Sequence, residues 1–141
     1  MKLVITGASG LIGSALAREA EKNRIEVVKL VRRTPKEKNE SQWDPNKGVI
    51  DLAALENSTA IVHLAGAGVG DHRWTKKYKK EILNSRVNST ETLANAIVNL
   101  RTPPSVFVSG SAMGYYGDTG DVAVDENAGL GEGFLSDVVF N

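Results

Sequence analysis

The sequence contains no cysteine, which excludes disulfides, thiolate metal sites and thiol catalysis. Its two histidines, His63 and His72, have no carboxylate cluster at metal-ligand spacing beside them, so we expect no metal site. No apolar run approaches the roughly 20 residues that a membrane-spanning helix needs. Seventeen basic and seventeen acidic residues cancel, so no overall field favours nucleic acid or a membrane surface as a partner.

Two motifs of phosphate and acyl chemistry are also missing. No Gly-Lys-Ser/Thr sequence occurs, which excludes a P-loop. The segment Ser109-Gly110-Ser111 has no glycine two places before a serine, which excludes the nucleophile elbow of hydrolases. An apolar strand pattern begins at Leu3 and leaves no room for a signal peptide, so we expect a cytoplasmic protein.

A glycine-rich turn lies between an expected strand and an expected helix. The apolar residues 3–5 predict a short buried strand, and an alanine-rich pattern over about 11–23 predicts a helix. Between them Gly7, Gly10 and Gly13 have the spacing G-x-x-G-x-x-G, which permits a tight turn, approach of a pyrophosphate and close packing of helix on strand. Free N–H groups at the helix start would face the anion. The turn therefore predicts a dinucleotide site, and the alternative is an ordinary tight turn.

Strand and helix patterns alternate along the rest of the chain. Buried strands are expected at 26–31, 60–65 and 105–109, an edge strand at 41–43, a short helix at 52–55 and a long helix from 75 to about 100. The apolar face of the long helix is expected at Leu83, Val87, Thr90, Ala94 and Ile97, with Leu93 and Leu100 beside it. This alternation predicts a parallel sheet with helices on both faces.

Arg32 and Arg33 directly follow the expected strand 26–31. In a dinucleotide fold the adenine ribose lies there, where an acid accepts the 2′-OH of NAD and an arginine suits the 2′-phosphate of NADP. The position holds no acid, and two guanidinium groups offer paired donors to a phosphate. The pair therefore favours NADP(H) over NAD(H), and the alternative is two solvated loop charges.

Further candidates stand where other expected strands end. His63, on a buried strand, is interpreted as a hydrogen-bonded core residue rather than a catalyst. Ser111 follows the strand 105–109, and its hydroxyl is placed to hydrogen-bond a substrate oxygen. The basic run 76–80 opens the long helix and is interpreted as its solvated face. Small or apolar residues that let a nucleotide lie against the backbone follow His63, namely Leu64, Ala65 and Gly66.

The segment 6–13, T-G-A-S-G-L-I-G, matches throughout the motif T-G-x-x-G-x-x-G, and the chain resembles the extended short-chain dehydrogenase/reductase superfamily. More narrowly, it resembles the atypical branch of NAD(P)-dependent, sugar-nucleotide epimerase-like proteins called epimerase family proteins. The segments that carry this resemblance are Trp43-Asp44-Pro45, His63-Leu64-Ala65-Gly66, Arg73-Trp74, Ser85-Arg86, Ser111-Ala112 with Tyr116-Gly117, and Gly133-Phe134-Leu135.

The resemblance implies an α/β Rossmann fold, a doubly wound parallel sheet of about five strands in the order 3-2-1-4-5. It also implies NADP(H) binding and hydride transfer on a sugar nucleotide or small carbonyl. Ser111 matches the superfamily's catalytic Ser/Thr position. For Glu81 and Arg86 the alternative to cofactor contact is a helix-surface ion pair. The expected cofactor contacts are Gly7, Ser9, Gly10, Leu11, Ile12, Gly13, Arg32, Arg33, Leu64, Ala65, Gly66, Glu81 and Arg86.

The sequence departs from the superfamily at the usual Tyr-x-x-x-Lys pair, where it has Phe134 and Val138. Phenylalanine has no proton to give, and valine cannot lower the pKa of a tyrosine. Tyr116, or its neighbour Tyr115, is the candidate to replace the acid beside Ser111. Whether the chain is an enzyme stays open, and the alternative is a non-catalytic NADP(H)-binding module or an inactive fragment.

The resembled proteins continue for roughly as long again. We therefore expect residues 1–141 to form one domain, the cofactor half, truncated on its C-terminal side and without the substrate-binding part. The outer edge of the last strand would then lie open, which favours a homo-oligomer through this edge. The substrate cannot be read from these residues.

Overall fold

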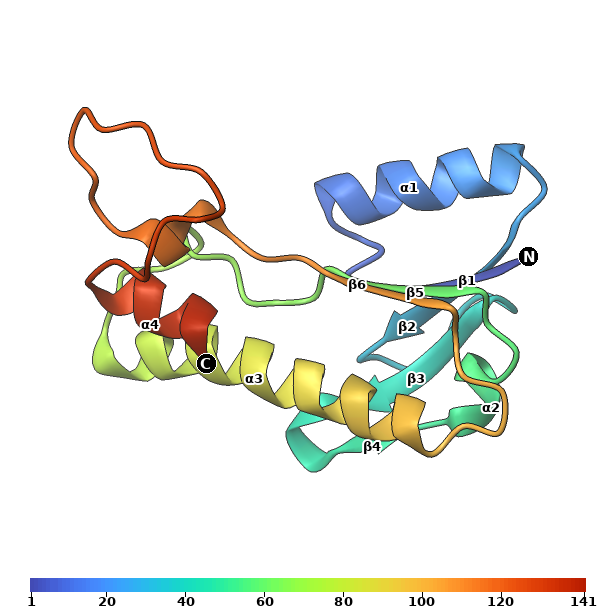
Figure 1. Cartoon of the computed structure of the whole chain (residues 1–141). Coiled ribbons are helices and arrows are strands. Elements are labelled where there is room, and N and C mark those ends of the chain that lie inside the picture. Colours follow the sequence, from blue (N-terminus) through green and yellow to red (C-terminus); the bar gives the residue numbers. More distant parts are fainter. The chain divides into compact units, whose positions relative to one another are not determined.

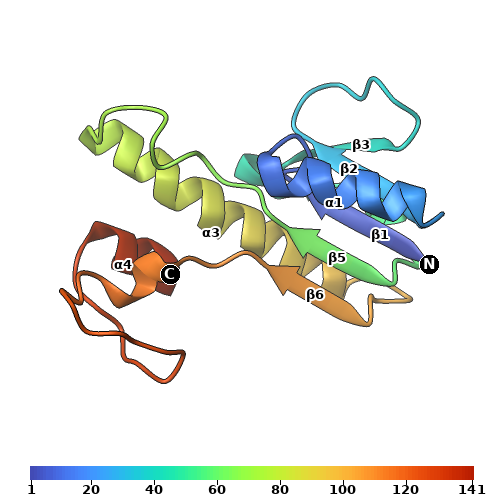
Figure 2. The ribbon, with the colours of Figure 1, turned by 90° about the horizontal axis from the view of Figure 1, so that it is seen from above.

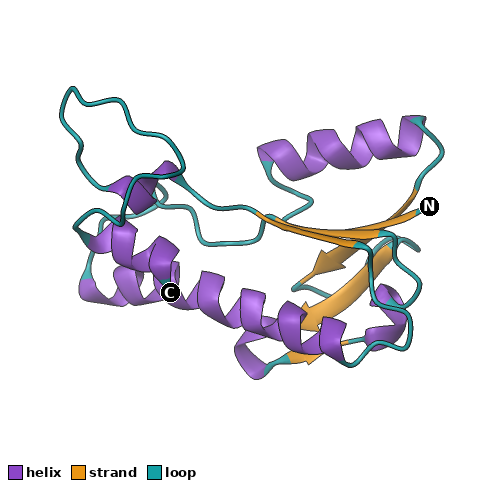
Figure 3. Ribbon diagram, viewed as in Figure 1, coloured by secondary structure: helices purple, strands orange, loops and turns teal.

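The computed structural model describes all of residues 1–141 as two compact units, Met1–Gly110 and Ser111–Asn141. A single domain over the whole chain stays a prediction. The first unit contains β1 (Lys2–Thr6), α1 (Leu11–Lys22), β2 (Glu26–Val31), β3 (Glu40–Asp44), η1 (Pro45–Lys47), β4 (Val49–Ile50), α2 (Leu52–Leu55), β5 (Ala60–His63), α3 (Lys76–Val98) and β6 (Val106–Ser109) (Figure 1). The second unit contains η2 (Met113–Tyr116) and α4 (Phe134–Phe140), joined by loops (Figure 3).

The sheet of the first unit has the strand order β4-β3-β2-β1-β5-β6. Five of these strands are parallel, and their order confirms the expected 3-2-1-4-5 arrangement of a Rossmann fold. The helices α1 and α3 lie on opposite faces of the sheet (Figure 1). The carboxyl ends of the parallel strands therefore meet at one edge between two helices, which is where ligands bind in such sheets.

A sixth strand, β4, was not expected from the sequence. It is antiparallel to β3 and pairs Trp43 with Ile50 and Asp44 with Val49. Two residues are too few for an alternating pattern, so only the hairpin geometry reveals this strand. The Asp44 side chain accepts a hydrogen bond from the Asn46 N–H at 3.1 Å and so begins the intervening helix η1.

The apolar side chains pack in two clusters, one against each face of the sheet. Along β1 the side chains alternate between them, with Val4 in one cluster and Leu3 and Ile5 in the other. The α3 face holds Val4, Leu30, Trp43, Leu55, Ile61, Leu93, Ala96 and Leu100. The α1 face holds Leu3, Ile5, Ala17, Ala20 and Val27. A strand buried on both faces explains why β1 reads as a continuous apolar run.

The buried face of α3 differs from the expected one. Its buried side chains include Tyr78, Ile82, Ser89, Leu93 and Ala96, and the last four each stand one position before an expected member. Leu93 and Leu100, expected beside the apolar face, are buried, whereas the residues expected at its centre are half-buried or, for Ala94, exposed. The buried face is therefore rotated from the expected one by about 100°, the angle of one residue. The spacing of apolar residues does not reveal this rotation, because the buried face also contains polar residues such as Ser89, whose hydrogen bonds are made within the protein. Neither α3 nor any other helix is long and apolar enough to cross a membrane.

The expectation that 105–109 forms a buried strand is also wrong on burial. The strand β6 forms, but Val106, Phe107 and Val108 are 49%, 37% and 47% exposed. Figure 2 shows β6 at the edge of the sheet. An apolar run marks a strand, but only the tertiary structure shows whether other elements cover it.

Candidate functional site

The glycine turn between β1 and α1 is shaped by close backbone contacts. The Gly10 N–H donates to the Gly7 carbonyl at 3.0 Å, which closes the turn. Gly7 has φ +66°, and a Cβ there would lie 2.6 Å from the Leu64 carbonyl oxygen. A Cβ on Gly13 would overlap the Gly7 carbonyl. At Gly10, by contrast, a Cβ would meet only the Gly7 oxygen at 3.3 Å, so Gly10 is not required by the fold in the same way.

A cleft of about 920 Å³ opens at the carboxyl edge of the sheet, beside this turn. Its walls come from the glycine turn, the ends of β2, β3 and β5, and one side of α3. Nine of the expected cofactor contacts line it, namely Gly7, Ser9, Gly10, Arg32, Arg33, Leu64, Ala65, Gly66 and Glu81. The other four, Leu11, Ile12, Gly13 and Arg86, are not among its lining residues.

These four residues have different surroundings. Leu11 and Ile12 begin α1 with side chains 89% and 68% exposed, so only their backbone N–H groups are placed to act at the helix start. Gly13 is buried against Gly7 and packs the helix on the turn. Arg86 donates through Nη1 to the carbonyls of Ala67 and Ile82, both at 3.0 Å.

The charged side chains of the cleft are unequally engaged. Glu40 is held by Arg33, and Lys29 lies 3.4 Å from both Glu21 and Glu37. Arg32 makes no hydrogen bond or ion pair, although it lines the same cleft. An unpaired guanidinium beside a glycine turn is free to meet an anion.

Two lysines of α3 line the cleft, and the sequence analysis assigned them only to a solvated helix face. Lys77 and Lys80 lie on the cleft side, whereas Lys76 and Lys79 do not. Neither Lys77 nor Lys80 has an ion-pair partner. Spacing of three residues puts them on one side of the helix, and this signal became useful only once the orientation of α3 was known. The cleft thus carries unpaired positive charge in a chain whose net charge is zero.

The loop after β5 is fastened to the first half of α3. The Ala67 N–H donates to Ser85 Oγ at 2.9 Å, and the Tyr78 hydroxyl donates to the Gly68 carbonyl at 2.6 Å. The Arg86 guanidinium lies under Gly66, and burial lowers its pKa. Arg86 forms no ion pair with Glu81, so the surface-pair alternative is not what the structure has. The loop that forms one wall of the cleft is therefore ordered by its own contacts.

His63 is buried, as the sequence analysis interpreted it. Its ring lies between the hydroxyl groups of Thr6 and Ser89, and the Trp43 ring meets it edge-on with centroids 6.3 Å apart. Burial lowers the pKa of His63 to about 4, so the ring is neutral near pH 7.

Ser111 and Tyr116 belong to the second unit. Ser111 is exposed and makes no hydrogen bond, and Tyr116 ends η2 with its ring edge-on to Tyr115, centroids 5.3 Å apart. Ser136, which the sequence analysis did not single out, donates to the Gly114 carbonyl at 2.9 Å and fastens α4 to η2. A buried serine in a short apolar helix gave no sequence signal for this role.

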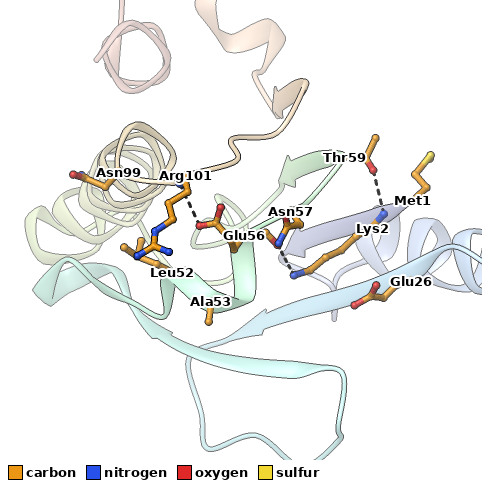
Figure 4. A pocket seen from close by; sticks show the side chains of 10 residues that line it. All are labelled: Met1, Lys2, Glu26, Leu52, Ala53, Glu56, Asn57, Thr59, Asn99 and Arg101. Carbon is orange, nitrogen blue, oxygen red and sulfur yellow. Dashed lines mark hydrogen bonds between the residues drawn. The ribbon is translucent and has the colours of Figure 1, made fainter.

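A second hollow, of about 740 Å³, lies at the opposite edge of the sheet, where β1 and β5 begin (Figure 4). Several of its polar groups form hydrogen bonds within the protein. Lys2 Nζ donates to the Glu56 carbonyl at 3.0 Å, and the Glu56 carboxylate accepts from the Arg101 N–H at 3.3 Å (Figure 4). The same carboxylate also accepts from the Thr102 N–H at 2.6 Å. These bonds fasten the connections around α2 and α3, which is a structural role.

Comparison with known proteins adds to this geometry. Residues 3–132 match the NAD dependent epimerase/dehydratase family. The chain is 40% identical over 134 residues to the epimerase family protein ML0860 of Mycobacterium leprae, covering 95% of this chain and 43% of that protein. It thus spans less than half the length of this relative.

Two solved structures are similar along nearly the whole chain. Human epimerase family protein SDR39U1, solved with NADPH, is 28% identical with a TM-score of 0.84, covering 99% of this chain and 46% of that one. MoeE5, solved with UDP-glucose and NAD, is 27% identical with a TM-score of 0.79 and the same coverage. Similar proteins therefore bind nicotinamide dinucleotides of both kinds. With its glycine turn, strand order and matched residues 3–132, this chain belongs to the NAD dependent epimerase/dehydratase family.

Proposed function

We propose that this chain binds NADP(H) in the cleft at the carboxyl edge of its sheet. The observation that carries the proposal is the glycine turn, in which Gly7 and Gly13 leave no room for a Cβ while Gly10 borders the cleft. Because these glycines have no side chains, a pyrophosphate can approach the N–H groups at the start of α1. The residues present suit a bound NADP(H), since the cleft also holds the unpaired positive charges of Arg32, Lys77 and Lys80.

The other cleft residues suit the remaining parts of the dinucleotide. Leu64, Ala65 and Gly66 provide a flat backbone surface for the adenosine, and Ser9 and the N–H groups of Leu11 and Ile12 stand at the helix start. Glu81 lines the α3 wall and Arg86 acts through the loop that it holds. In the sequence interpretation all of these residues contact the cofactor.

The preference for NADP(H) over NAD(H) rests on charge. Arg32 is unpaired, whereas Glu37 and Glu40, which line the same cleft, already have cationic partners. No free carboxylate near the end of β2 is left to accept a ribose 2′-OH. A 2′-phosphate gains a charge-assisted contact there, whereas a hydroxyl does not. SDR39U1 bound to NADPH is consistent with this choice, and MoeE5 bound to NAD is the precedent against it.

When bound, the nicotinamide would supply hydride transfer, and we propose a small carbonyl or a sugar nucleotide as the substrate class. Ser111 would orient the substrate oxygen, and Tyr116 would hold or give its proton. The second candidate function is a non-catalytic NADP(H)-binding module. It is favoured by Phe134 and Val138, which stand where a tyrosine and a lysine are usual.

We also propose that this chain associates with a second copy through β6. Its apolar residues are exposed and its outer edge has no strand partner, a combination that promotes pairing between chains. A cytoplasmic location stays a prediction from the sequence.

The first test is a titration of the 141-residue chain with NADPH and with NADH, followed by nucleotide fluorescence and thermal shift. We expect NADPH to bind at least about tenfold more tightly, the size of one charge-assisted contact. Equal binding of the two would refute the NADP(H) preference. Binding of neither would refute the proposed function for this chain.

A further inference from the structure

His63 lies at the carboxyl end of β5 with a hydrogen-bond partner at each ring nitrogen. Nδ1 is 2.6 Å from Thr6 Oγ1, and Nε2 is 3.0 Å from Ser89 Oγ. The residue is only 4% exposed, so no bulk water replaces either partner. A neutral imidazole has one N–H donor and one bare acceptor, and the partners decide which nitrogen is which.

Thr6 decides it. Its Oγ1 accepts hydrogen bonds from the Leu64 N–H at 3.1 Å and the Ala65 N–H at 3.2 Å, which occupies both lone pairs. The only role left for the Thr6 hydroxyl proton is donation to His63 Nδ1. Nδ1 is therefore the bare nitrogen.

The other nitrogen completes the chain of hydrogen bonds. Nε2 carries the proton of the neutral ring and donates it to Ser89 Oγ. The Ser89 hydroxyl in turn donates to the Ser85 carbonyl at 2.6 Å. Each hydrogen bond that links the side chains of Ser89, His63 and Thr6 then has one direction, and buried networks of this kind fix a single arrangement.

This network reaches the glycine turn. Thr6 directly precedes Gly7, and Gly7 lies so near the Leu64 carbonyl that a Cβ would stand 2.6 Å from it. The two hydrogen bonds from Leu64 and Ala65 to Thr6 set the spacing of these backbones. The same two segments form adjoining walls of the cleft.

We propose that His63 is a positioning residue for nucleotide binding: by accepting the Thr6 hydroxyl proton at Nδ1, it directs both Oγ1 lone pairs to the Leu64 and Ala65 N–H groups and so holds the glycine turn. The inference rests on the proposed function of the cleft. Protonation of the ring ends the arrangement. Thr6 Oγ1 would then face three N–H donors with two lone pairs, so one backbone N–H would lose its acceptor.

The groups around the ring leave His63 as the titrating group of this network. Thr6 from β1, Trp43 from β3, Ser109 from β6 and Ser89 from α3 are all neutral. On the neighbouring turn of α3, Arg86 directs its guanidinium to backbone carbonyls of its own helix and of the loop after β5. Burial alone accounts for the low pKa of His63.

Amide replacements separate the two ring nitrogens. In His63→Asn the side-chain oxygen stands close to the position of Nδ1 and still accepts from Thr6. In His63→Gln the amide stands close to Nε2, and Thr6 loses its acceptor. We expect His63→Asn to keep the dissociation constant for NADP⁺ within about threefold and His63→Gln to raise it about tenfold, the size of one lost buried hydrogen bond. If His63 had only a structural role, the two variants would bind NADP⁺ equally, either both more weakly than the wild type or both as tightly.

Thr6 provides a second pair of variants that tests the same bond from the other side. Thr6→Ser keeps the hydroxyl, and we expect affinity close to the wild type. Thr6→Val keeps the shape but removes the hydroxyl, and we expect about tenfold weaker binding of NADP⁺. Equal affinity of the serine and valine variants would overturn the proposal.

Nitrogen-15 NMR of the wild-type ring needs no variant to fold. We expect His63 at pH 7 to show a protonated Nε2 and a bare Nδ1, with exposed His72 as the internal reference. A proton on Nδ1 would overturn the proposal. A wild-type chain that binds no nucleotide would refute the proposed function, whereas wild-type binding with four unaffected variants would refute only the role of His63.

Discussion

Arg33 holds Glu40 in a two-pronged ion pair, with Nη1 donating to Oε2 at 2.8 Å and Nη2 donating to Oε1. The same carboxylate accepts from the Lys36 N–H at 2.7 Å, so it organises the loop between β2 and β3. The Arg33 hydrogen bonds, followed by that of Lys36, lower the pKa of Glu40 to about 2. Of two adjacent arginines, one is thus committed to the fold, while Arg32 has no partner.

Replacing Arg32 tests the cofactor preference. We expect Arg32→Gln to weaken NADPH binding tenfold to a hundredfold, about the size of a charge-assisted hydrogen bond, and to leave NADH binding nearly unchanged. Arg33→Gln is the matched control, because it removes the same charge from the next residue. Its effect on the two nucleotides should be similar, since it acts through the loop. Titrations of both variants with both nucleotides distinguish the roles, and equal selectivity of the two variants would contradict the assignment.

Substitutions at Gly10 and Gly13 should affect different properties, nucleotide affinity at Gly10 and stability at Gly13. In Gly10→Val the Cβ would stand 3.3 Å from the Gly7 oxygen, a smaller conflict than at Gly13, and the side chain borders the cleft, so we expect at least about tenfold weaker nucleotide binding and a stability loss of about 1 kcal/mol. In Gly13→Ala the Cβ overlaps the Gly7 carbonyl, so we expect a loss of about 1–3 kcal/mol in unfolding free energy. Urea denaturation and nucleotide titration measure the two effects. A Gly10→Val chain with full affinity would place the nucleotide elsewhere.

The free energy of unfolding should decrease as the pH is lowered, because His63 is protonated more readily in the unfolded chain. Its pKa is about 4 in the folded chain against 6.5 when unfolded, so between these values the unfolded chain binds the extra proton. The stabilisation is complete above pH 6.5, is lost as the pH falls towards 4, and amounts to about 3 kcal/mol. The Arg33–Glu40 pair adds to the loss only below about pH 4.5, where an unfolded glutamate takes up its proton. Urea denaturation at several pH values should show this slope in the wild type and a flatter one in His63→Asn.

The exposed edge strand should cause concentration-dependent association. We expect the double variant Val106→Lys, Val108→Lys to be monomeric where the wild type associates, because charge on an edge strand opposes pairing. Both side chains are already exposed, so stability should change by less than about 0.5 kcal/mol. Sedimentation equilibrium measures the association. A wild-type chain that stays monomeric at high concentration would rule out pairing through β6.

The sequence by itself determined the alternation of strands and helices and the glycine turn. These follow from local patterns: apolar runs, glycine spacing and the position of Thr6-Gly7 between strand and helix. The resemblance carried by the same residues led to the family. The positions lining the cleft from Gly7, Arg32 and Leu64 also followed, because the ends of parallel strands meet at one edge.

Only the tertiary structure decided how side chains divide between the fold and the cleft. Nothing in the sequence separates Arg32 from Arg33, since the difference is made by Glu40 across a loop. The orientation of α3 brings Ser89 against His63, a contact between residues that are 26 positions apart. The proton on His63 depends on Thr6, which is 57 residues away. Hydrogen bonds and ion pairs of this kind are set by distances between distant segments, which a local pattern does not contain.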